Sequence, residues 1–314
     1  MNRTIAPEHQ WPISLDNPVW MHLGAWWVKA ASWQAIFGEL PDVETTVKAL
    51  QLLQASGLAY AVEADRRRQY QNSGTLPWQF NEPYPMAACT SAVDYYAQPK
   101  PAYYAVARVY EPVHLSAKFP VQAWAGRERF ECEVWVSSSL EQACETARLE
   151  QAVIGLSGKR YTQSQQPVRV GSNGSYRLGS MEWDLSDLEE DVFFLDLILA
   201  GAGGELLAQD RTIFTRTTNL SPLLAAPGTQ LEVHQSAETG PRRLTLTNRG
   251  EATALFVWLE DCQAETGSVY FSDNYFCLFP GETRLIDVTW DEDSRAPECI
   301  EVRGWNFPKE QLWI

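Results

Sequence analysis

The chain has few cationic side chains for its length. Its 314 residues carry 25 Lys and Arg against 40 Asp and Glu, which gives a formal net charge of -15. A nucleic-acid backbone or an anionic membrane surface needs a basic footprint, so neither is expected as a partner. The one basic run, Arg66-Arg67-Arg68, is typical of the solvated end of a helix. Long apolar runs are also missing, and so is a signal peptide, so we expect neither a membrane span nor a leader.

Closely spaced metal ligands are absent too. The six cysteines form no CxxC pair, and the four histidines show no spacing typical of a metal site or of a Ser-His-Asp triad. Zinc ligands usually come in such pairs, so we expect no metal and no cofactor. Asp273 and Asn274 are interpreted as a turn and not as a calcium loop. Cys132 and Cys277 lie in strand-like runs and are expected to be small buried side chains, which favours a reducing, cytoplasmic compartment.

Aromatic residues, by contrast, are abundant, with 13 Trp, 12 Tyr and 12 Phe. An excess of Trp is common in carbohydrate-active proteins, where the indole face covers a sugar ring. Large cores between domains use Trp equally well. A chain of 314 residues is expected to form two or three domains, so both interpretations stay open at this point.

Residues 1–110 are predicted to be the helical part. Asp42 is a predicted N-cap, and apolar residues recur every three to five positions from Val43 onward, which predicts one long helix ending near Tyr70. Residues 75–80 are predicted to form a short strand, and residues 101–109 one more short helix. Helix, strand, loop and helix form the unit of an α/β barrel, whose usual size is about 250 residues. The helical part is therefore either the tail of a larger barrel or a cap on the domain that follows.

From Glu111 onward the apolar pattern changes to period two, which predicts strands. A first β-sandwich is expected over residues 111–216. Within it, residues 192–199 form a continuous apolar strand, and residues 140–156 hold either a small helix or an edge strand. A second sandwich is expected over residues 217–314, after a polar connector. The predicted fold is multidomain and mainly β.

The most informative segment is the loop expected after residue 80, which reads Leu76-Pro77-Trp78-Gln79-Phe80-Asn81-Glu82-Pro83-Tyr84-Pro85. Its prolines cannot continue a helix or a central strand. Flat rings stack on the apolar face of a pyranose, whereas amides and carboxylates bind its hydroxyls. The segment therefore predicts a sugar-binding site made of four residues: Trp78, Asn81, Glu82 and Tyr84.

The pair Asn81-Glu82 also has the form of an acid/base site, because in many barrel glycosidases an Asn beside the catalytic acid holds the sugar 2-hydroxyl. Retaining hydrolysis needs a second carboxylate about 5–5.5 Å away. Upstream, only Glu8 and Asp16 sit in loop-like sequence, since the other acidic residues lie on the predicted long helix or near its start. The catalytic pair is not evident. Glu82 is expected to contact substrate or to bond the loop, with catalysis as the less favoured alternative.

Two segments of the chain carry signatures that resemble one known family. Residues 78–85 are similar to a Trp-Gln-Leu-Asn-Asp-x-Trp-Pro segment, and residues 91–104 to the Ser-x-x-Asp-Tyr-Tyr and Lys-x-x-x-Tyr-Tyr elements that follow it. Residues 272–282 are similar to an Asp-Asn-Tyr-Phe-x-Leu-x-Pro-Gly-Glu signature. In this order they resemble β-mannosidase-like enzymes of glycoside hydrolase family two. Glu82 and Tyr84 depart from the pattern, which has Asp and Trp there.

The resemblance implies the C-terminal portion of a retaining glycosidase. Residues 1–110 would be the end of a (β/α)8 barrel with its eighth strand, and residues 111–216 and 217–314 two immunoglobulin-like sandwiches. The acid/base and the nucleophile would lie outside this chain, which has no Ser-Glu-Phe-Gly-like motif, so the chain alone is expected to be inactive. Trp78 would be a sugar platform and Glu82 a hydroxyl acceptor. The implied partners are a carbohydrate and the remainder of the parent enzyme.

Two other interpretations stay open. The sandwiches by themselves would suit a non-catalytic carbohydrate-binding or assembly module, marked by exposed aromatic residues on a sheet face; the candidates are Trp124, Trp135 and Trp183. Alternatively, the chain is one subunit that completes a barrel with a partner.

Overall fold

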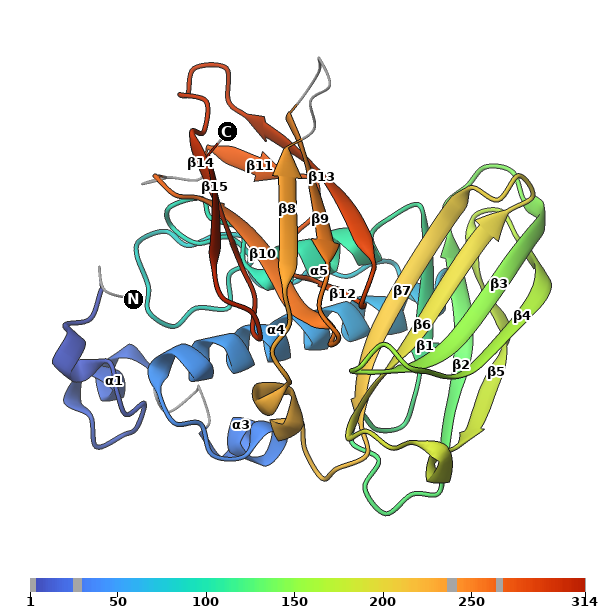
Figure 1. The fold of residues 1–314 in the computed structure, drawn as a ribbon, viewed down its shortest axis with the longest axis horizontal. Coiled ribbons are helices and arrows are strands. Elements are labelled where there is room, and N and C mark those ends of the chain that lie inside the picture. Colours follow the sequence, from blue (N-terminus) through green and yellow to red (C-terminus); the bar gives the residue numbers. More distant parts are fainter. Residues whose placement is uncertain (1–3, 25–29, 236–241, 264–267, 314) are drawn as a thin grey trace.

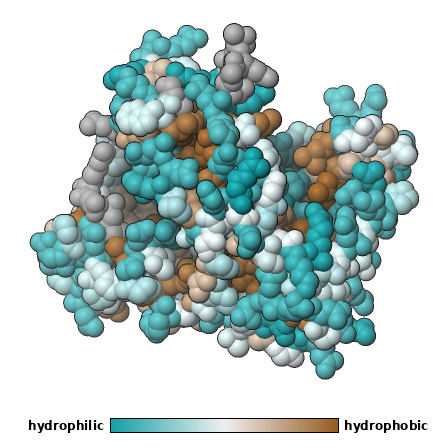
Figure 2. Space-filling view, in the orientation of Figure 1, coloured by the Kyte–Doolittle hydropathy of each residue, from teal (hydrophilic) through white to brown (hydrophobic). Residues whose placement is uncertain are grey.

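The computed structural model describes residues 4–24, 30–235, 242–263 and 268–313. Helices occupy the N-terminal part: η1 (Pro7–His9), α1 (Pro18–Leu23), α3 (Ala30–Phe37), α4 (Val43–Arg67) and α5 (Pro101–Val109). None of the helices in these ranges is long and apolar enough to cross a membrane. Hydrophilic residues cover most of the face shown in Figure 2, and apolar residues appear there in scattered patches.

The long helix α4 has the start that the sequence predicts. The Asp42 side chain accepts a hydrogen bond from the amide of Thr45 at 2.7 Å, which satisfies one of the free donors of the first turn. Gly57 lies inside the helix without ending it. The helix stops at Arg67, short of the predicted Tyr70, because the C-cap residue Arg68 leaves the helical region with φ of −101° and ψ of 21°.

The strand predicted over residues 75–80 is not formed. A strand needs a hydrogen-bonded neighbour along its length. The carbonyls of Gln79 and Phe80 accept bonds from the amides of Ala92 and Val93. An isolated bridge joins Asn81 to Val93, and the Thr75 carbonyl accepts a bond from the Tyr110 hydroxyl, but neither contact forms a continuous ladder. The segment is therefore a loop with hydrogen bonds at both of its ends.

The first sandwich consists of two antiparallel sheets, in the orders β1-β2-β5 and β4-β3-β6-β7. Its strands are β1 (Val113–Lys118), β2 (Arg129–Ser138), β3 (Cys144–Gly155), β4 (Arg160–Val170), β5 (Gly174–Asp184), β6 (Val192–Gly201) and β7 (Leu206–Thr215). The segment that the sequence left open between helix and edge strand is β3, and it lies between β4 and β6. A short η2 turn (Leu185–Asp187) follows β5.

The second sandwich is also built from two antiparallel sheets, in the orders β12-β10-β14-β15 and β11-β13-β9-β8. Its strands are β8 (Leu231–Gln235), β9 (Arg242–Asn248), β10 (Ala254–Asp261), β11 (Val269–Phe271), β12 (Phe276–Leu278), β13 (Thr283–Trp290), β14 (Cys299–Arg303) and β15 (Glu310–Trp313). The connector between the sandwiches contains η3 (Ser221–Ala225), whose Leu223 is buried. Figure 1 shows α4 lying beneath this sandwich and reaching the first sandwich at its C-terminal end.

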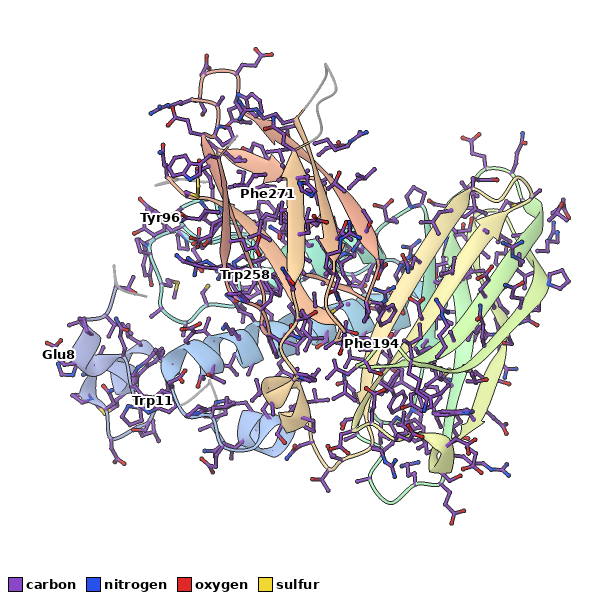
Figure 3. All side chains as sticks on the ribbon, in the orientation of Figure 1. Glu8, Trp11, Tyr96, Phe194, Trp258 and Phe271 are labelled. Carbon is purple, nitrogen blue, oxygen red and sulfur yellow. A yellow bond between two sulfur atoms is a disulfide. The ribbon has the colours of Figure 1, made fainter. Side chains whose placement is uncertain are left out.

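Strand β6 is apolar at nearly every position because both of its faces are buried. Phe193 and Leu195 belong to the core of the first sandwich. Phe194 points the other way, into a third core that it shares with Phe37 of α3 and Phe279 of the second sandwich. Figure 3 shows Phe194 at this junction. The helical part and both sandwiches are thus held around one common cluster.

Cys262 and Cys299 form a disulfide, which corrects the expectation that the cysteines are unpaired. The two residues are 37 positions apart and carry no local motif. They meet because β10 pairs with β14, where Asp261 lies opposite Ile300. The inference of a reducing compartment therefore loses its basis. Cys132 is free and buried, as expected, whereas Cys277 is free but only half-buried.

Candidate substrate-binding site

The loop that the sequence singled out presents a row of exposed apolar side chains. Leu76, Trp78 and Phe80 are 93%, 79% and 66% exposed, and Tyr84 is 59% exposed. Single exposed apolar residues are ordinary, but four within nine residues indicate a contact surface. The predicted contact residue Asn81 is exposed beside them.

Glu82 lies in the middle of the same loop but points inward and is only 5% exposed. Its Oε1 accepts hydrogen bonds from the Ser91 hydroxyl and the Lys100 ammonium, both at 2.6 Å. Its Oε2 accepts a bond from the Tyr95 amide at 3.3 Å. Lys100 also donates to the Ser91 hydroxyl at 2.7 Å, so the three side chains form a closed set. A carboxylate can accept about four hydrogen bonds, so these three bonds leave acceptor capacity on Oε2, and the role of Glu82 as a hydroxyl acceptor stays a prediction.

The protonation state of Glu82 follows from these bonds. Burial by itself would raise the pKa of the carboxyl, but the hydrogen bonds from Lys100 and Ser91 and the Lys100 charge outweigh it and hold the pKa below the ordinary value. Glu82 is therefore a carboxylate at neutral pH. A general acid must carry a proton and needs a raised pKa, so this environment does not suit an acid/base role.

A compact turn joins the loop to α5. The amide of Lys100 donates to the Ala92 carbonyl at 2.9 Å, and the Asp94 side chain accepts from the amides of Tyr96 and Gln98 at 2.8 and 2.9 Å. Figure 3 shows Tyr96 beside the second sandwich, on the side where Trp258 of β10 lies. Tyr96 of this turn thus lies next to the second sandwich.

The other end of α5 contacts the second sandwich directly. Arg108 donates two hydrogen bonds to one Asp273 oxygen, at 3.0 and 2.6 Å, and one to the Asn274 carbonyl. The other Asp273 oxygen lies 3.2 Å from the Arg284 guanidinium. The Asn274 side chain bonds both the amide and the carbonyl of Leu259. The predicted turn at Asp273 and Asn274 therefore joins α5 to the second sandwich, and it is held by side chains of α5 and β13 and by the main chain of β10.

The other residues predicted from sequence lie elsewhere. Glu8 and Asp16 are both exposed in the N-terminal segment, and Figure 3 places Glu8 at that edge of the molecule. Trp124 was proposed as an exposed aromatic residue, and this is wrong, because it is 1% exposed and packs on Phe130 in the sandwich core. Trp135 and Trp183 are half-buried. The sandwiches therefore lack the open aromatic platform at Trp124 that a separate sugar-binding module would use.

One cluster of metal-ligating type was not predicted. Glu63 of α4, His114 of β1 and Asp210 of β7 bring one ligand atom each within 4.8 Å of one another. The His114 Nε2 lies 2.9 Å from a Glu63 oxygen, and both residues are buried. Sequence reasoning missed the cluster because its members come from three distant segments. The donors, one imidazole and two carboxylates, are of a type that divalent transition metals accept.

Protonation of its carboxyl groups can neutralise the same cluster without a metal. Burial raises the pKa of Glu63 to about 8, against the lowering effect of Arg67 and Arg66. Burial and the nearby Glu63 charge raise the pKa of Asp210 to about 7. Burial lowers the pKa of His114 to about 4, so the imidazole is neutral. Glu63, His114 and Asp210 line a cavity of about 1390 Å³ between α4 and the sandwiches, and Trp78 and Tyr84 are not among its lining residues.

Sequence comparison relates the chain to glycosidases. Residues 211–307 match a family model described as the exo-β-D-glucosaminidase Ig-fold domain. A β-mannosidase B of Aspergillus niger is 26% identical over 262 residues, which are 79% of this chain and 29% of that protein. A β-mannosidase B of Aspergillus clavatus is 33% identical over 109 residues, which are 32% of this chain and 13% of that protein. The chain spans less than a third of the length of these relatives.

Solved structures show the same fold. The exo-chitosanase CsxA of Amycolatopsis orientalis matches with a TM-score of 0.76 at 16% identity, over 91% of this chain and 37% of that one. The β-D-mannosidase of Dictyoglomus thermophilum matches with a TM-score of 0.68 at 20% identity, over 88% of this chain and 31% of that one. Both sandwiches are thus of the immunoglobulin-like type expected. These comparisons support the predicted resemblance of the chain to the C-terminal portion of β-mannosidase-like enzymes of glycoside hydrolase family two.

Proposed function

We propose that this chain forms one wall of the sugar pocket of a retaining glycosidase that acts on terminal β-linked sugars, as a β-mannosidase does. The observation that carries the proposal is the exposed row on the loop, where Trp78 and Tyr84 flank Asn81 while the carboxylate between them is buried. The names of the relatives, β-mannosidases and an exo-chitosanase, support a sugar as the ligand.

Within this wall, Trp78 offers an indole face to the apolar side of a pyranose, and Tyr84 offers a second ring with a hydroxyl. Asn81 supplies amide donors and acceptors for a sugar hydroxyl. Glu82 stands behind these three residues, with its oxygens already bonded to Ser91, Lys100 and Tyr95.

The catalytic carboxylates are proposed to lie outside this chain. A retaining glycosidase needs an acid/base and a nucleophile about 5–5.5 Å apart. Glu82 is buried and paired with Lys100, and Glu8 and Asp16 are exposed in the N-terminal segment. The chain by itself is therefore proposed to be inactive and to supply the pocket wall and two accessory sandwiches.

The division into domains belongs to the same proposal: the end of a (β/α)8 barrel over residues 1–110, then sandwiches over 111–216 and 217–314. The described residues of the first part form helices and loops. Residues 75–80 are proposed to become the eighth barrel strand when neighbouring strands pair with them. Those neighbours would come from the part of the relatives' length that this chain does not span, either in one longer polypeptide or in a separate subunit.

Hydrolysis of nitrophenyl β-glycosides and sugar titrations test the proposal together. The chain alone is expected to give no turnover with mannoside, glucosaminide or galactoside substrates. Turnover that is abolished by Glu82→Gln would overturn the proposal and make Glu82 catalytic. Co-expression with an upstream polypeptide that carries a Ser-Glu-Phe-Gly-like motif is expected to restore turnover. In that complex, Trp78→Ala should weaken substrate binding, with Tyr70→Ala as the matched control for removal of an exposed ring.

A further inference from the structure

We propose that Glu82 is a positioning residue, whose buried carboxylate fastens the aromatic loop of residues 78–84 to the start of α5 through Ser91 and Lys100. The importance of this fastening for sugar binding rests on the function proposed above. The fastening itself rests only on contacts within this chain.

The three side chains form a polar network at the wall of the cavity described above, which Glu82 and Lys100 both line. The side chains of Glu82 and Lys100 are 2% and 17% exposed, so little water reaches the ion pair. The Ser91 hydroxyl is within hydrogen-bond distance of both partners, which satisfies it fully. Removing one partner from a buried pair leaves the other charge uncompensated, so these three residues should act as one unit.

The network joins segments that have no regular structure of their own. Glu82 lies in the loop, Ser91 starts the turn, and Lys100 is the residue before the first turn of α5. Lys100 is the N-cap residue, and its ammonium, which can only donate hydrogen bonds, donates to the Glu82 carboxylate. The aromatic loop is therefore oriented by the helix.

Helix α5 carries this connection further to the second sandwich. Arg108, at its other end, bonds Asp273 and Asn274. The Tyr104 ring packs on Tyr275 with centroids 5.9 Å apart. The two signature segments of the sequence, residues 78–85 and 272–282, thus contact the same short helix at its two ends. The second sandwich is therefore connected to the loop through α5.

Hydrogen–deuterium exchange of the 314-residue chain tests the proposal. In Glu82→Gln, the amides of Ala92, Val93 and Tyr95 are expected to exchange at least tenfold faster than in the unchanged chain. The amides of β6 should keep their rates, which shows that the fold persists. Glu141→Gln is the matched control, because Glu141 is exposed. Ser91→Ala provides a milder variant in case Glu82→Gln fails to fold, and Lys100→Met removes the opposite charge of the pair.

Combined variants sharpen the test. Glu82→Gln with Lys100→Met should increase exchange no more than the stronger single change, because both remove the same interaction. Glu82→Asp, which keeps the charge, should retain more protection than Glu82→Gln. Unchanged exchange in Glu82→Gln and Lys100→Met would contradict the proposal. If Glu82→Gln kept its exchange rates but lost sugar binding, Glu82 would be a hydroxyl acceptor and not a positioning residue. The variants could exchange faster, as expected, while the unchanged protein binds no sugar. That result would overturn the proposed function and leave the positioning role intact.

Discussion

The Arg108 guanidinium lies 2.6 Å from the Asp273 carboxylate, and this ion pair connects α5 to the second sandwich across 165 positions of sequence. Asp273 also pairs with Arg284 of β13. The aromatic loop is bound to the same helix through Lys100. The relative position of the loop and the second sandwich is therefore set by one nine-residue helix.

We expect Arg108→Met to lower the free energy of unfolding by about 1–2 kcal/mol. The pair is partly buried, so its value lies between that of an exposed ion pair and that of a fully buried one. Urea unfolding measures the change. Arg169→Met is the matched control, because Arg169 and Glu145 form an exposed pair for which a smaller loss is expected. Equal losses in the two variants would show that the α5 contact is not special.

The stability of the chain should fall as pH rises from about 6.5 to 8. Glu63 has a pKa of about 8 in the folded chain and 4.5 as its ordinary value. Between these values the folded state holds a proton that the unfolded state has released, so raising the pH favours unfolding. Asp210, with a pKa raised to about 7, acts in the same direction. His114, with a pKa lowered to about 4, acts oppositely and only below about 6.5, where the unfolded imidazole gains a proton.

Glu63→Gln should flatten this pH dependence, since the amide keeps the shape of the side chain and does not titrate. The slope is expected to lose up to about 1.4 kcal/mol per pH unit, the value for one proton. Urea midpoints measured at pH 6.5, 7, 7.5 and 8 give the slope. Glu141→Gln serves as control and should leave it unchanged. A slope that persists in full in Glu63→Gln would mean that Glu63 is ionised in the folded chain.

The sequence predicted those parts of the fold that are set by local patterns. Period-two alternation indicated most strands, and Asp42 and the apolar spacing after it indicated α4. The continuous run at residues 192–199 predicted a buried strand, but not that Phe194 would face a core shared by three parts of the chain. Contacts between distant segments have no local pattern, so the Cys262–Cys299 disulfide and the Glu63–His114–Asp210 cluster were both missed.

The candidate site was located by residue type, but the side-chain directions were not. The sequence grouped Trp78, Asn81, Glu82 and Tyr84 as one contact set. The direction of a loop side chain depends on the hydrogen-bonding partners within its reach. Glu82 points inward because it bonds Ser91 and Lys100. Ser91 and Lys100 begin the two motif elements that follow the loop. They could have indicated that Glu82 is buried, since a buried carboxylate needs such partners.

The disulfide should contribute several kcal/mol to stability. Its loop spans 37 residues, for which the chain-entropy model gives about 4 kcal/mol. The double variant Cys262→Ser/Cys299→Ser is expected to unfold at a lower temperature than the oxidised chain and to be insensitive to reductant. Thiol titration of the denatured chain should count four groups before reduction and six after it. Cys89→Ser is the control. Six free thiols before reduction would contradict the bond.

Two tryptophans should respond in opposite ways to truncation. Trp78 is 79% exposed, so Trp78→Ala is expected to change the free energy of unfolding by less than about 0.5 kcal/mol. Trp124 is 1% exposed and lies among the rings of the first sandwich, so Trp124→Ala should cost about 3–5 kcal/mol. Urea unfolding of both variants measures the contrast. In the complex with a catalytic partner, Trp78→Ala alone should weaken sugar binding, by about 1–3 kcal/mol for one stacked ring. A large stability loss in Trp78→Ala would place its indole inside the chain, and the pocket wall would then need another platform.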